Sequence, residues 1–150
     1  MITAIHKMVE QARSGGNPRV IAKLASGWAV LGEKQVLRGY SLLLPDPVVP
    51  HLNAMALEVR KQFLVDMSIL GEAVLNVTGA TRINYEMLGN LEPALHAHVI
   101  PRYPEVESEI LRIKPIWFYD WDQAPLFDLQ RDKDLLHILA AELKKLNAAS

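Results

Sequence analysis

A short apolar segment between two prolines constrains this chain more than any other stretch. Residues 94–100 read Ala-Leu-His-Ala-His-Val-Ile between Pro93 and Pro101, and this composition and length predict a β-strand. Alternate side chains of a strand share one face, so His96 and His98 point to the same side. Ala94 and Ile100 share that side, whereas Leu95, Ala97 and Val99 point to the opposite side. The strand therefore places two imidazoles next to each other.

Hydrogen-bond donors come just before this strand. Gly89 and Asn90 are expected to form a loop that offers free backbone amides and a carboxamide. Imidazoles and amide donors that converge on one point suit an anionic ligand, most of all a phosphate group.

Three interpretations of the histidine pair stay open at this point. The pair can be two partly wet histidines without a role, because histidine is often only half buried. It can supply two metal ligands, but zinc takes three or four, the chain has no cysteine, and His6, His51 and His137 show no metal-ligand spacing. It can also bind phosphate or attack it, because near pH 7 histidine is largely a neutral nucleophile and a neighbour can donate a proton.

The run from Leu95 to Tyr103 resembles the signature of the histidine triad (HIT) superfamily, in which alternating histidines and apolar residues precede Pro-Arg. Asn84 and the Gly89-Asn90 pair fall close to the Asn and Gly-Gln positions of that family. Residues 39–45 resemble its Gly-His-x-Leu-Val-x-Pro strand, and the resemblance covers roughly residues 28–103.

The sequence departs from the family pattern at three positions. Ala94 stands where the first histidine of the triad is expected, Leu91 replaces a hydroxyl residue, and Asn90 replaces a longer glutamine. The resemblance implies that His96 attacks the α-phosphorus of a nucleotide while a backbone carbonyl at the first triad position holds its ring. Ala94 can still supply that carbonyl.

The resemblance further implies a nucleotide hydrolase or nucleotidyl transferase, similar to the diadenosine polyphosphate hydrolases, that cleaves nucleoside polyphosphates or phosphoramidates through a nucleotidyl-histidine. The implied catalytic residues are His96 and His98, and the implied nucleotide or phosphate ligands are Asn84, Gly89, Asn90, His51 and, for the ribose, Glu33 or its neighbour Gly32. The roles of Asn84, His51 and Glu33 compete with plainer ones: a strand-end residue for Asn84, an exposed residue before a helix for His51, and a solvated turn for Glu33.

No metal is implied for the nucleophile, although a divalent cation can accompany a polyphosphate substrate. The implied assembly is a homodimer. The main alternative is a nucleotide-binding module that has lost efficient turnover, because Ala94 and Leu91 remove two supporting groups.

Composition limits the remaining function classes. The chain has 150 residues, of which 50% are hydrophobic and 22% charged, and this predicts one globular domain with a real core. A net charge of −1 with both signs interspersed argues against nonspecific DNA or RNA binding. We see no signal peptide and no membrane-spanning run, and the absence of cysteine fits a reducing compartment, so we expect a cytoplasmic protein without membrane association.

Periodicity predicts an α+β fold, with an antiparallel sheet of about five strands, one long packing helix, and N- and C-terminal helices. Expected helices cover about 2–13, 53–78 and 132–146, and expected strands 19–24, 28–31, 40–44, 81–85 and 94–100. We expect Asn53 to cap the long helix and Val59 to lie on its buried stripe. The resemblance implies that residues 1–150 form a single HIT-like domain, with residues 1–18 as an N-terminal helix and turn and 104–150 as a C-terminal extension. The aromatic patch at 115–121 can stack on a base, seal a subunit contact or pack on the core.

Overall fold

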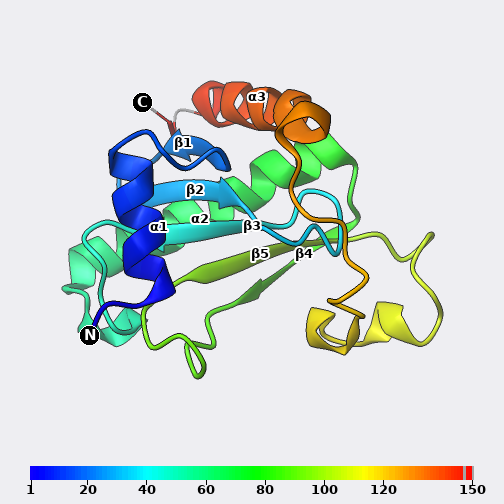
Figure 1. Ribbon diagram of the computed structural model, residues 1–150, viewed down its shortest axis with the longest axis horizontal. Coiled ribbons are helices and arrows are strands. Elements are labelled where there is room, and N and C mark those ends of the chain that lie inside the picture. Colours follow the sequence, from blue (N-terminus) through cyan, green and yellow to red (C-terminus); the bar gives the residue numbers. More distant parts are fainter. Residues whose placement is uncertain (147, 150) are drawn as a thin grey trace.

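The computed structural model describes residues 1–146 and 148–149, and it shows a five-stranded antiparallel sheet flanked by helices (Figure 1). The strand order is β1-β2-β3-β5-β4. The strands are β1 (Val20–Lys23), β2 (Gly27–Leu31), β3 (Ser41–Pro45), β4 (Arg82–Glu86) and β5 (Ala97–Arg102), and the helices are α1 (Ala4–Arg13), α2 (Leu57–Thr78) and α3 (Leu129–Lys145). The predicted α+β architecture is confirmed.

The two faces of the sheet bury two separate hydrophobic clusters. On one face α2 and α3 pack against alternate residues of the strands, among them Leu43 and Val99. On the other face α1 and part of the C-terminal segment cover Leu42 and Ile100. The alternation of side chains in each strand thus separates a helix-covered face from a face that is only partly covered.

Strand β5 lies inside the sheet, and all six of its residues are buried. It pairs with β3, where Leu42 is opposite His98, and with β4, where Glu86 is opposite His98. The residues predicted to point away from the histidines, Leu95 and Val99 among them, pack in the hydrophobic cluster under α2 and α3, here called the α2 cluster. Ala94 and Ile100 pack in the cluster on the opposite face, under α1. The predicted assignment of faces is therefore confirmed.

Two expectations for the long helix are wrong. Asn53 lies in a short 3₁₀ turn, Leu52–Ala54, and α2 starts four residues later with Ala56 at its N-cap and no side-chain cap. Val59 is half exposed rather than buried. The apolar spacing instead places Asp66 in the buried stripe, where its carboxylate accepts hydrogen bonds from the amide and hydroxyl of Ser26 and so fastens α2 to the β1–β2 turn.

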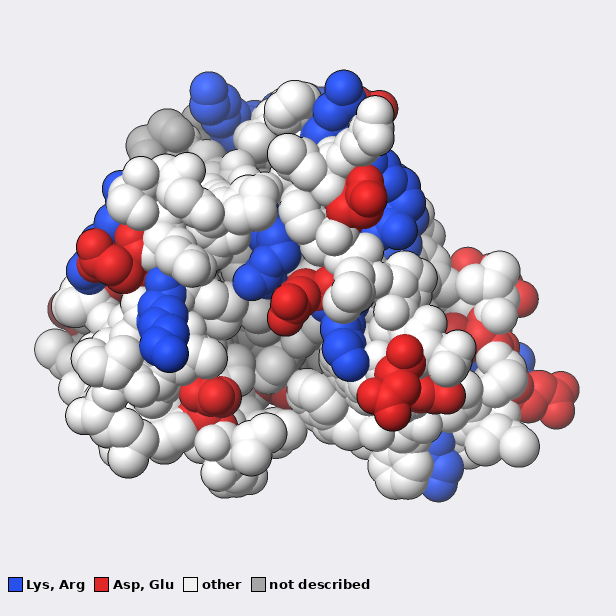
Figure 2. Space-filling model, in the orientation of Figure 1, with Lys and Arg blue, Asp and Glu red and all other residues white. Residues whose placement is uncertain are grey.

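Positive and negative side chains are mixed on the face drawn in Figure 2, without a broad region of one sign. Recognition of an anion on this face must therefore come from a local arrangement of donors. None of the helices in the described part of the chain combines the length and the hydrophobicity that crossing a membrane requires.

Replacing Phe63 tests the contact between α2 and the sheet. Phe63 is fully buried in the α2 cluster, so Phe63→Ala should lower the free energy of unfolding by about 3–5 kcal/mol. Urea denaturation measures this value. Val65→Ala, at a half-exposed position of the same helix, is the matched control and should change it by less than about 0.5 kcal/mol. Equal losses in the two variants would contradict this packing.

Candidate active site

Two cavities meet at His96. The first, here called the His51 cavity, measures about 520 Å³ and lies between the segments 50–53 and 87–96. The second, here called the Trp117 cavity, measures about 370 Å³ and includes Tyr40, His98 and Trp117. Both cavities share four lining residues, Leu88, Gly89, Asn90 and His96. The His96 ring therefore borders both cavities.

The loop before β5 gives the two cavities their common wall. Gly89 has φ of +66°, a left-handed conformation that glycine adopts without a steric penalty. Asn90 follows it and is exposed, so its carboxamide is open to a ligand. The sequence thus predicted correctly that Gly89 and Asn90 lie beside His96.

The ring of His96 is oriented by its own backbone. Its Nδ1 lies 2.7 Å from the carbonyl oxygen of Ala94. A carbonyl can only accept, so Nδ1 carries the hydrogen, and in the neutral ring Nε2 keeps its lone pair. This is the hydrogen bond that the family resemblance implies, and it needs no side chain at position 94.

His98 lies next to His96 in a more buried place. The two ring centroids are 4.8 Å apart, and the Nδ1 of His98 lies 2.6 Å from the Tyr40 hydroxyl. Burial, and to a smaller degree the nearby His96, lowers the pKa of His98 from 6.5 to about 4. His98 is therefore neutral at pH 7, and its role in the free protein is that of a hydrogen-bond donor or acceptor rather than of a charged acid.

The structure brings His51 to this site but places two other predicted residues elsewhere. His51 is exposed and lines the His51 cavity together with His96. The carboxamide oxygen of Asn84 accepts a hydrogen bond from Arg102 at 2.9 Å, and Asn84 lines neither of the two cavities. Glu33 lines, with Gly32 and Arg19, a third cavity that touches the Trp117 cavity only through Tyr40.

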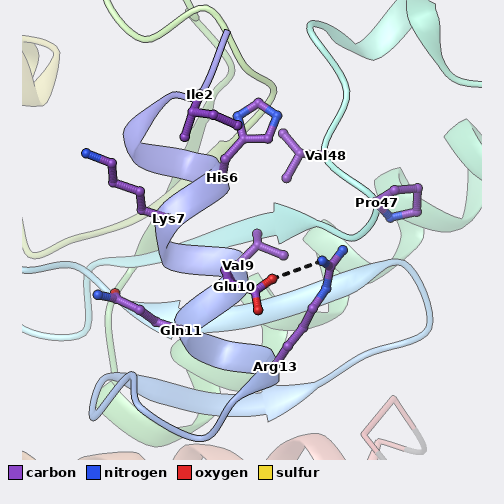
Figure 3. Close-up of a pocket in the computed structure, with 9 residues that line it drawn as sticks. All are labelled: Ile2, His6, Lys7, Val9, Glu10, Gln11, Arg13, Pro47 and Val48. Carbon is purple, nitrogen blue, oxygen red and sulfur yellow. Dashed lines mark hydrogen bonds and ion pairs between the residues drawn. The ribbon is translucent and has the colours of Figure 1, made fainter.

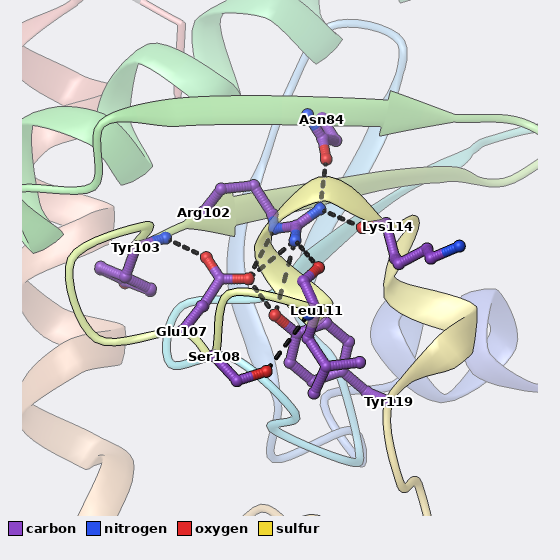
Figure 4. A network of polar contacts seen from close by, with 8 residues as sticks. All are labelled: Asn84, Arg102, Tyr103, Glu107, Ser108, Leu111, Lys114 and Tyr119. Atoms are coloured by element: carbon purple, nitrogen blue, oxygen red, sulfur yellow. Dashed lines mark hydrogen bonds and ion pairs between the residues drawn. The ribbon is translucent and has the colours of Figure 1, made fainter.

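Arg102 anchors the C-terminal segment to the sheet (Figure 4). Its guanidinium donates to Glu107 at 2.7 Å and 3.0 Å, and to the carbonyls of Leu111 and Lys114. The side chains of this ion pair are only 8% and 2% exposed. Burial alone would raise the pKa of Glu107, but hydrogen bonds from Arg102, from the Tyr119 hydroxyl and from a backbone amide lower it. A charged pair that is this well bonded holds residues 102–119 in place.

The anchored segment carries the predicted aromatic patch onto the histidine face. The rings of Trp117 and Trp121 stack with centroids 5.1 Å apart, and Trp117 meets His98 edge to face at 5.0 Å. The Nε1 of Trp117 donates to the Glu86 carboxylate on β4. Within this chain, therefore, the patch packs on the sheet and also forms one wall of the Trp117 cavity.

The sequence interpretation missed Tyr40, Glu86 and the specific place of Trp117. Tyr40 was visible only as a tyrosine at the position where the family pattern has histidine. Glu86 was visible as the residue two positions after Asn84, on the same strand face. Neither pattern predicts which residues Tyr40 and Glu86 contact, because those contacts depend on the register of β3, β4 and β5.

A larger cavity of about 690 Å³ lies elsewhere, between α1 and the segment that carries Pro47 and Val48 (Figure 3). Its lining includes Ile2, His6 and Val48, and it shares no residue with the cavities beside His96. His6 is occupied there, because its Nδ1 bonds the amide and hydroxyl of Thr3 as part of the helix cap.

Across residues 1–146 and 148–149, the histidine, aspartate and glutamate side chains form no group of three or more placed to hold a metal ion. The neighbouring rings of His96 and His98 could offer one nitrogen each. A zinc site would need further ligands from outside the chain.

Comparison with protein-family models and with curated protein sequences finds no match. Solved structures do match. A histidine triad protein from Marinobacter aquaeolei VT8 is 17% identical with a TM-score of 0.75, covering 97% of this chain and 99% of its own. A histidine triad protein from Sinorhizobium meliloti 1021 is 19% identical with a TM-score of 0.71, covering 89% and 93%. A zinc-bound histidine triad family protein from Mycobacterium smegmatis is 18% identical with a TM-score of 0.65, covering 95% and 99%. The chain therefore has the fold of the histidine triad proteins.

The low pKa of His98 has a measurable consequence for stability. The unfolded chain binds a proton at this residue below its ordinary pKa of 6.5, whereas the folded chain binds it only below about 4. Stability contributed by neutral His98 is thus complete above pH 6.5 and falls by up to about 3 kcal/mol as the pH decreases to 4. Urea denaturation of the parent and of His98→Gln at pH 7 and 4.5 should show a smaller loss in the variant. An equal decrease in the free energy of unfolding in both proteins would contradict the lowered pKa of His98.

Removing one partner of the Arg102–Glu107 pair tests the anchor of the C-terminal segment. Glu107→Gln leaves a buried guanidinium without its counter-charge, and we expect the free energy of unfolding to fall by about 3 kcal/mol. Tryptophan fluorescence should also shift to longer wavelength, since Trp117 and Trp121 lie on the released segment. Glu109→Gln, at an exposed neighbouring position, is the control and should behave as the parent. An unchanged fluorescence spectrum in Glu107→Gln would contradict the anchor.

Proposed function

We propose that this chain is a histidine triad enzyme that hydrolyses nucleotides or transfers nucleotidyl groups at the α-phosphate. One observation carries the proposal. The Nδ1 of His96 is held by the Ala94 carbonyl, so the free Nε2 belongs to a ring that borders two cavities joined by Gly89 and Asn90. An oriented neutral imidazole beside amide donors is suited to attack phosphorus.

The reaction proceeds in two displacements. The lone pair of His96 Nε2 forms a bond to the α-phosphorus while the bond to the leaving group breaks. A polyphosphate departs as an anion with that electron pair, and the amine of a phosphoramidate takes up a proton from solvent water as it departs. His98, with Gly89 and Asn90, stabilises the charge on the nonbridging oxygens. Water then attacks the nucleotidyl-histidine and loses a proton, which releases the nucleoside monophosphate and regenerates His96. A histidine intermediate divides one difficult displacement into two easier ones.

The two cavities suggest where the parts of a substrate lie. The Trp117 cavity offers aromatic and apolar surface next to His98 and suits a nucleoside. The His51 cavity offers His51, Asn53 and Asn90 and suits the polar leaving group, a polyphosphate or a phosphoramidate. Asn84 and Glu33 stay candidates for nucleotide binding only if the ligand reaches beyond these two cavities.

We also propose the wider properties that belong to such an enzyme. The protein acts in the cytoplasm on a small-molecule nucleotide, diadenosine polyphosphate included, and has no DNA, RNA or membrane partner. It needs no resident cofactor, and a divalent cation enters with a polyphosphate substrate. A homodimer is supported by the position of β4 at an edge of the sheet, where its free backbone groups can pair with another copy.

A second candidate function is nucleotide binding without turnover. Leu91 is 93% exposed and offers no hydroxyl to the loop beside His96, and Ala94 has no functional side chain. The third candidate, a metal site at the histidine pair, has the zinc-bound Mycobacterium smegmatis protein as its support. It predicts a metal that stays bound through purification and is lost in His98→Ala.

Intact-protein mass spectrometry tests the enzyme directly. We expect brief mixing with diadenosine polyphosphate or an adenosine phosphoramidate, quenched without acid, to add one nucleotidyl mass to the parent protein. His96→Ala should form no adduct and lose turnover, with little change in folding, because a half-buried side chain at a cavity contributes little to packing. His137→Ala, exposed on α3, is the matched control and should form the adduct.

Each other outcome selects a different account. Nucleotide binding without adduct or released monophosphate would favour the binding module. A parent protein that does not bind nucleotide at all, or a His96→Ala protein that unfolds and loses activity together, would contradict the proposed enzyme.

A further inference from the structure

We propose that the hydroxyl of Tyr40 fixes the tautomer of His98, so that His98 presents a permanent N–H donor beside the His96 nucleophile. Tyr40 is then a positioning residue, which acts on the ligand through the imidazole. The inference rests on the proposed function for its consequence in catalysis, but its structural content can be tested without any substrate.

Tyr40 and His98 form a short and buried hydrogen bond between β5 and the residue that precedes β3. The Tyr40 oxygen lies 2.6 Å from the Nδ1 of His98, and the two residues are only 5% and 8% exposed. At this distance the two atoms are in direct contact, with no water between them. The bond must therefore be made by one hydrogen, which belongs either to the hydroxyl or to Nδ1.

The hydroxyl is the donor. In the described part of the chain, His98 is the hydrogen-bond partner that the structure gives to the Tyr40 hydroxyl. If Nδ1 carried the hydrogen instead, the Tyr40 O–H would be buried without an acceptor, which is costly. Burial, together with the nearby Glu86 carboxylate, raises the pKa of Tyr40, so the hydroxyl keeps its proton at any working pH. The Nδ1 of His98 consequently accepts, and its hydrogen is on Nε2.

The two neighbouring histidines then have opposite tautomers for separate structural reasons. The Ala94 carbonyl forces the hydrogen of His96 onto Nδ1, and the Tyr40 hydroxyl forces the hydrogen of His98 onto Nε2. One ring offers an Nε2 lone pair, which can attack phosphorus, and the other offers an Nε2–H, which can donate to a phosphate oxygen. With the other tautomer, His98 would direct a lone pair at that oxygen and repel it.

Packing holds the His98 ring independently of this hydrogen bond. Trp117 lies against it edge to face at 5.0 Å, and Tyr40 lies nearly parallel to it, with an angle of 13° between the rings. Tyr40→Phe keeps the stacked ring and removes only the hydroxyl. The variant therefore changes the tautomer of His98 rather than its position.

Nitrogen NMR on histidine-labelled protein reports the tautomer of each ring. In the parent we expect His98 to show a nonprotonated Nδ1 and a protonated Nε2, and His96 to show the reverse, with His96→Ala and His98→Gln used for assignment. Tyr40→Phe should move the His98 signals toward the average of two exchanging tautomers and leave those of His96 unchanged. Tyr103→Phe loses a tyrosine hydrogen bond to the Arg38 carbonyl elsewhere in the fold, and should show the parent pattern.

Kinetics measure the consequence. We expect Tyr40→Phe to lower the rate of nucleotidyl transfer to His96 roughly tenfold, with KM little changed, since the lost donor acts mainly in the transition state. Tyr103→Phe should keep the parent rate. A parent protein with the hydrogen of His98 on Nδ1, or a Tyr40→Phe protein with unchanged His98 signals, would overturn the inference even if the variant is less active. If NMR shows the predicted tautomers but mass spectrometry finds no nucleotidyl adduct on the parent protein, the inference about Tyr40 stands and the proposed enzyme is rejected.

Discussion

The alternation of side chains along β5 is the constraint on which the rest of the structure depends. This strand has neighbours on both sides, so its residues cannot change register without moving an apolar side chain out of the core. Val99 and its alternate neighbours pack under α2, which leaves His98 on the opposite face. His96, just before the strand, follows the same alternation and reaches the two cavities. Packing on one face of the sheet thus sets the position of the chemical groups on the other.

The sequence predicted this part well because the information is local. The period of two, the flanking prolines and the glycine loop all lie within one short stretch, and they place His96, His98 and Gly89 correctly. Alanine at position 94 is compatible with this arrangement, since the group that orients His96 is a backbone carbonyl. A carbonyl is present whatever the side chain is.

The sequence does not predict contacts that are decided by distant segments. Asn84 has the right residue type for a phosphate ligand, but it bonds Arg102, whose guanidinium also gathers the C-terminal carbonyls. Asn53 looks like a helix cap, but the chain first makes a 3₁₀ turn, and α2 begins later. The Tyr40–His98 bond joins residues 58 positions apart. Such contacts follow from strand register and from the path of a long loop, which no local pattern specifies.

The C-terminal segment connects stability to the site. A buried ion pair adds little net stability, but it requires a defined geometry. Here the Arg102–Glu107 pair holds the segment that carries Trp117, and so it determines where Trp117 contacts His98. His98 is then enclosed by Tyr40 and Trp117, and this enclosure lowers its pKa and keeps it neutral. In the proposed enzyme, His96 is the nucleophile and the neutral His98 is a hydrogen-bond donor.

The stereochemistry at phosphorus tests the central claim, attack by His96, most directly. A nucleotide with sulfur in one configuration at the α-phosphorus can be hydrolysed in isotopically labelled water and the product configuration determined. Two successive in-line displacements, first by His96 and then by water, invert the phosphorus twice, so this account predicts overall retention. Overall inversion would mean that water attacks directly, and it would contradict a covalent role for His96.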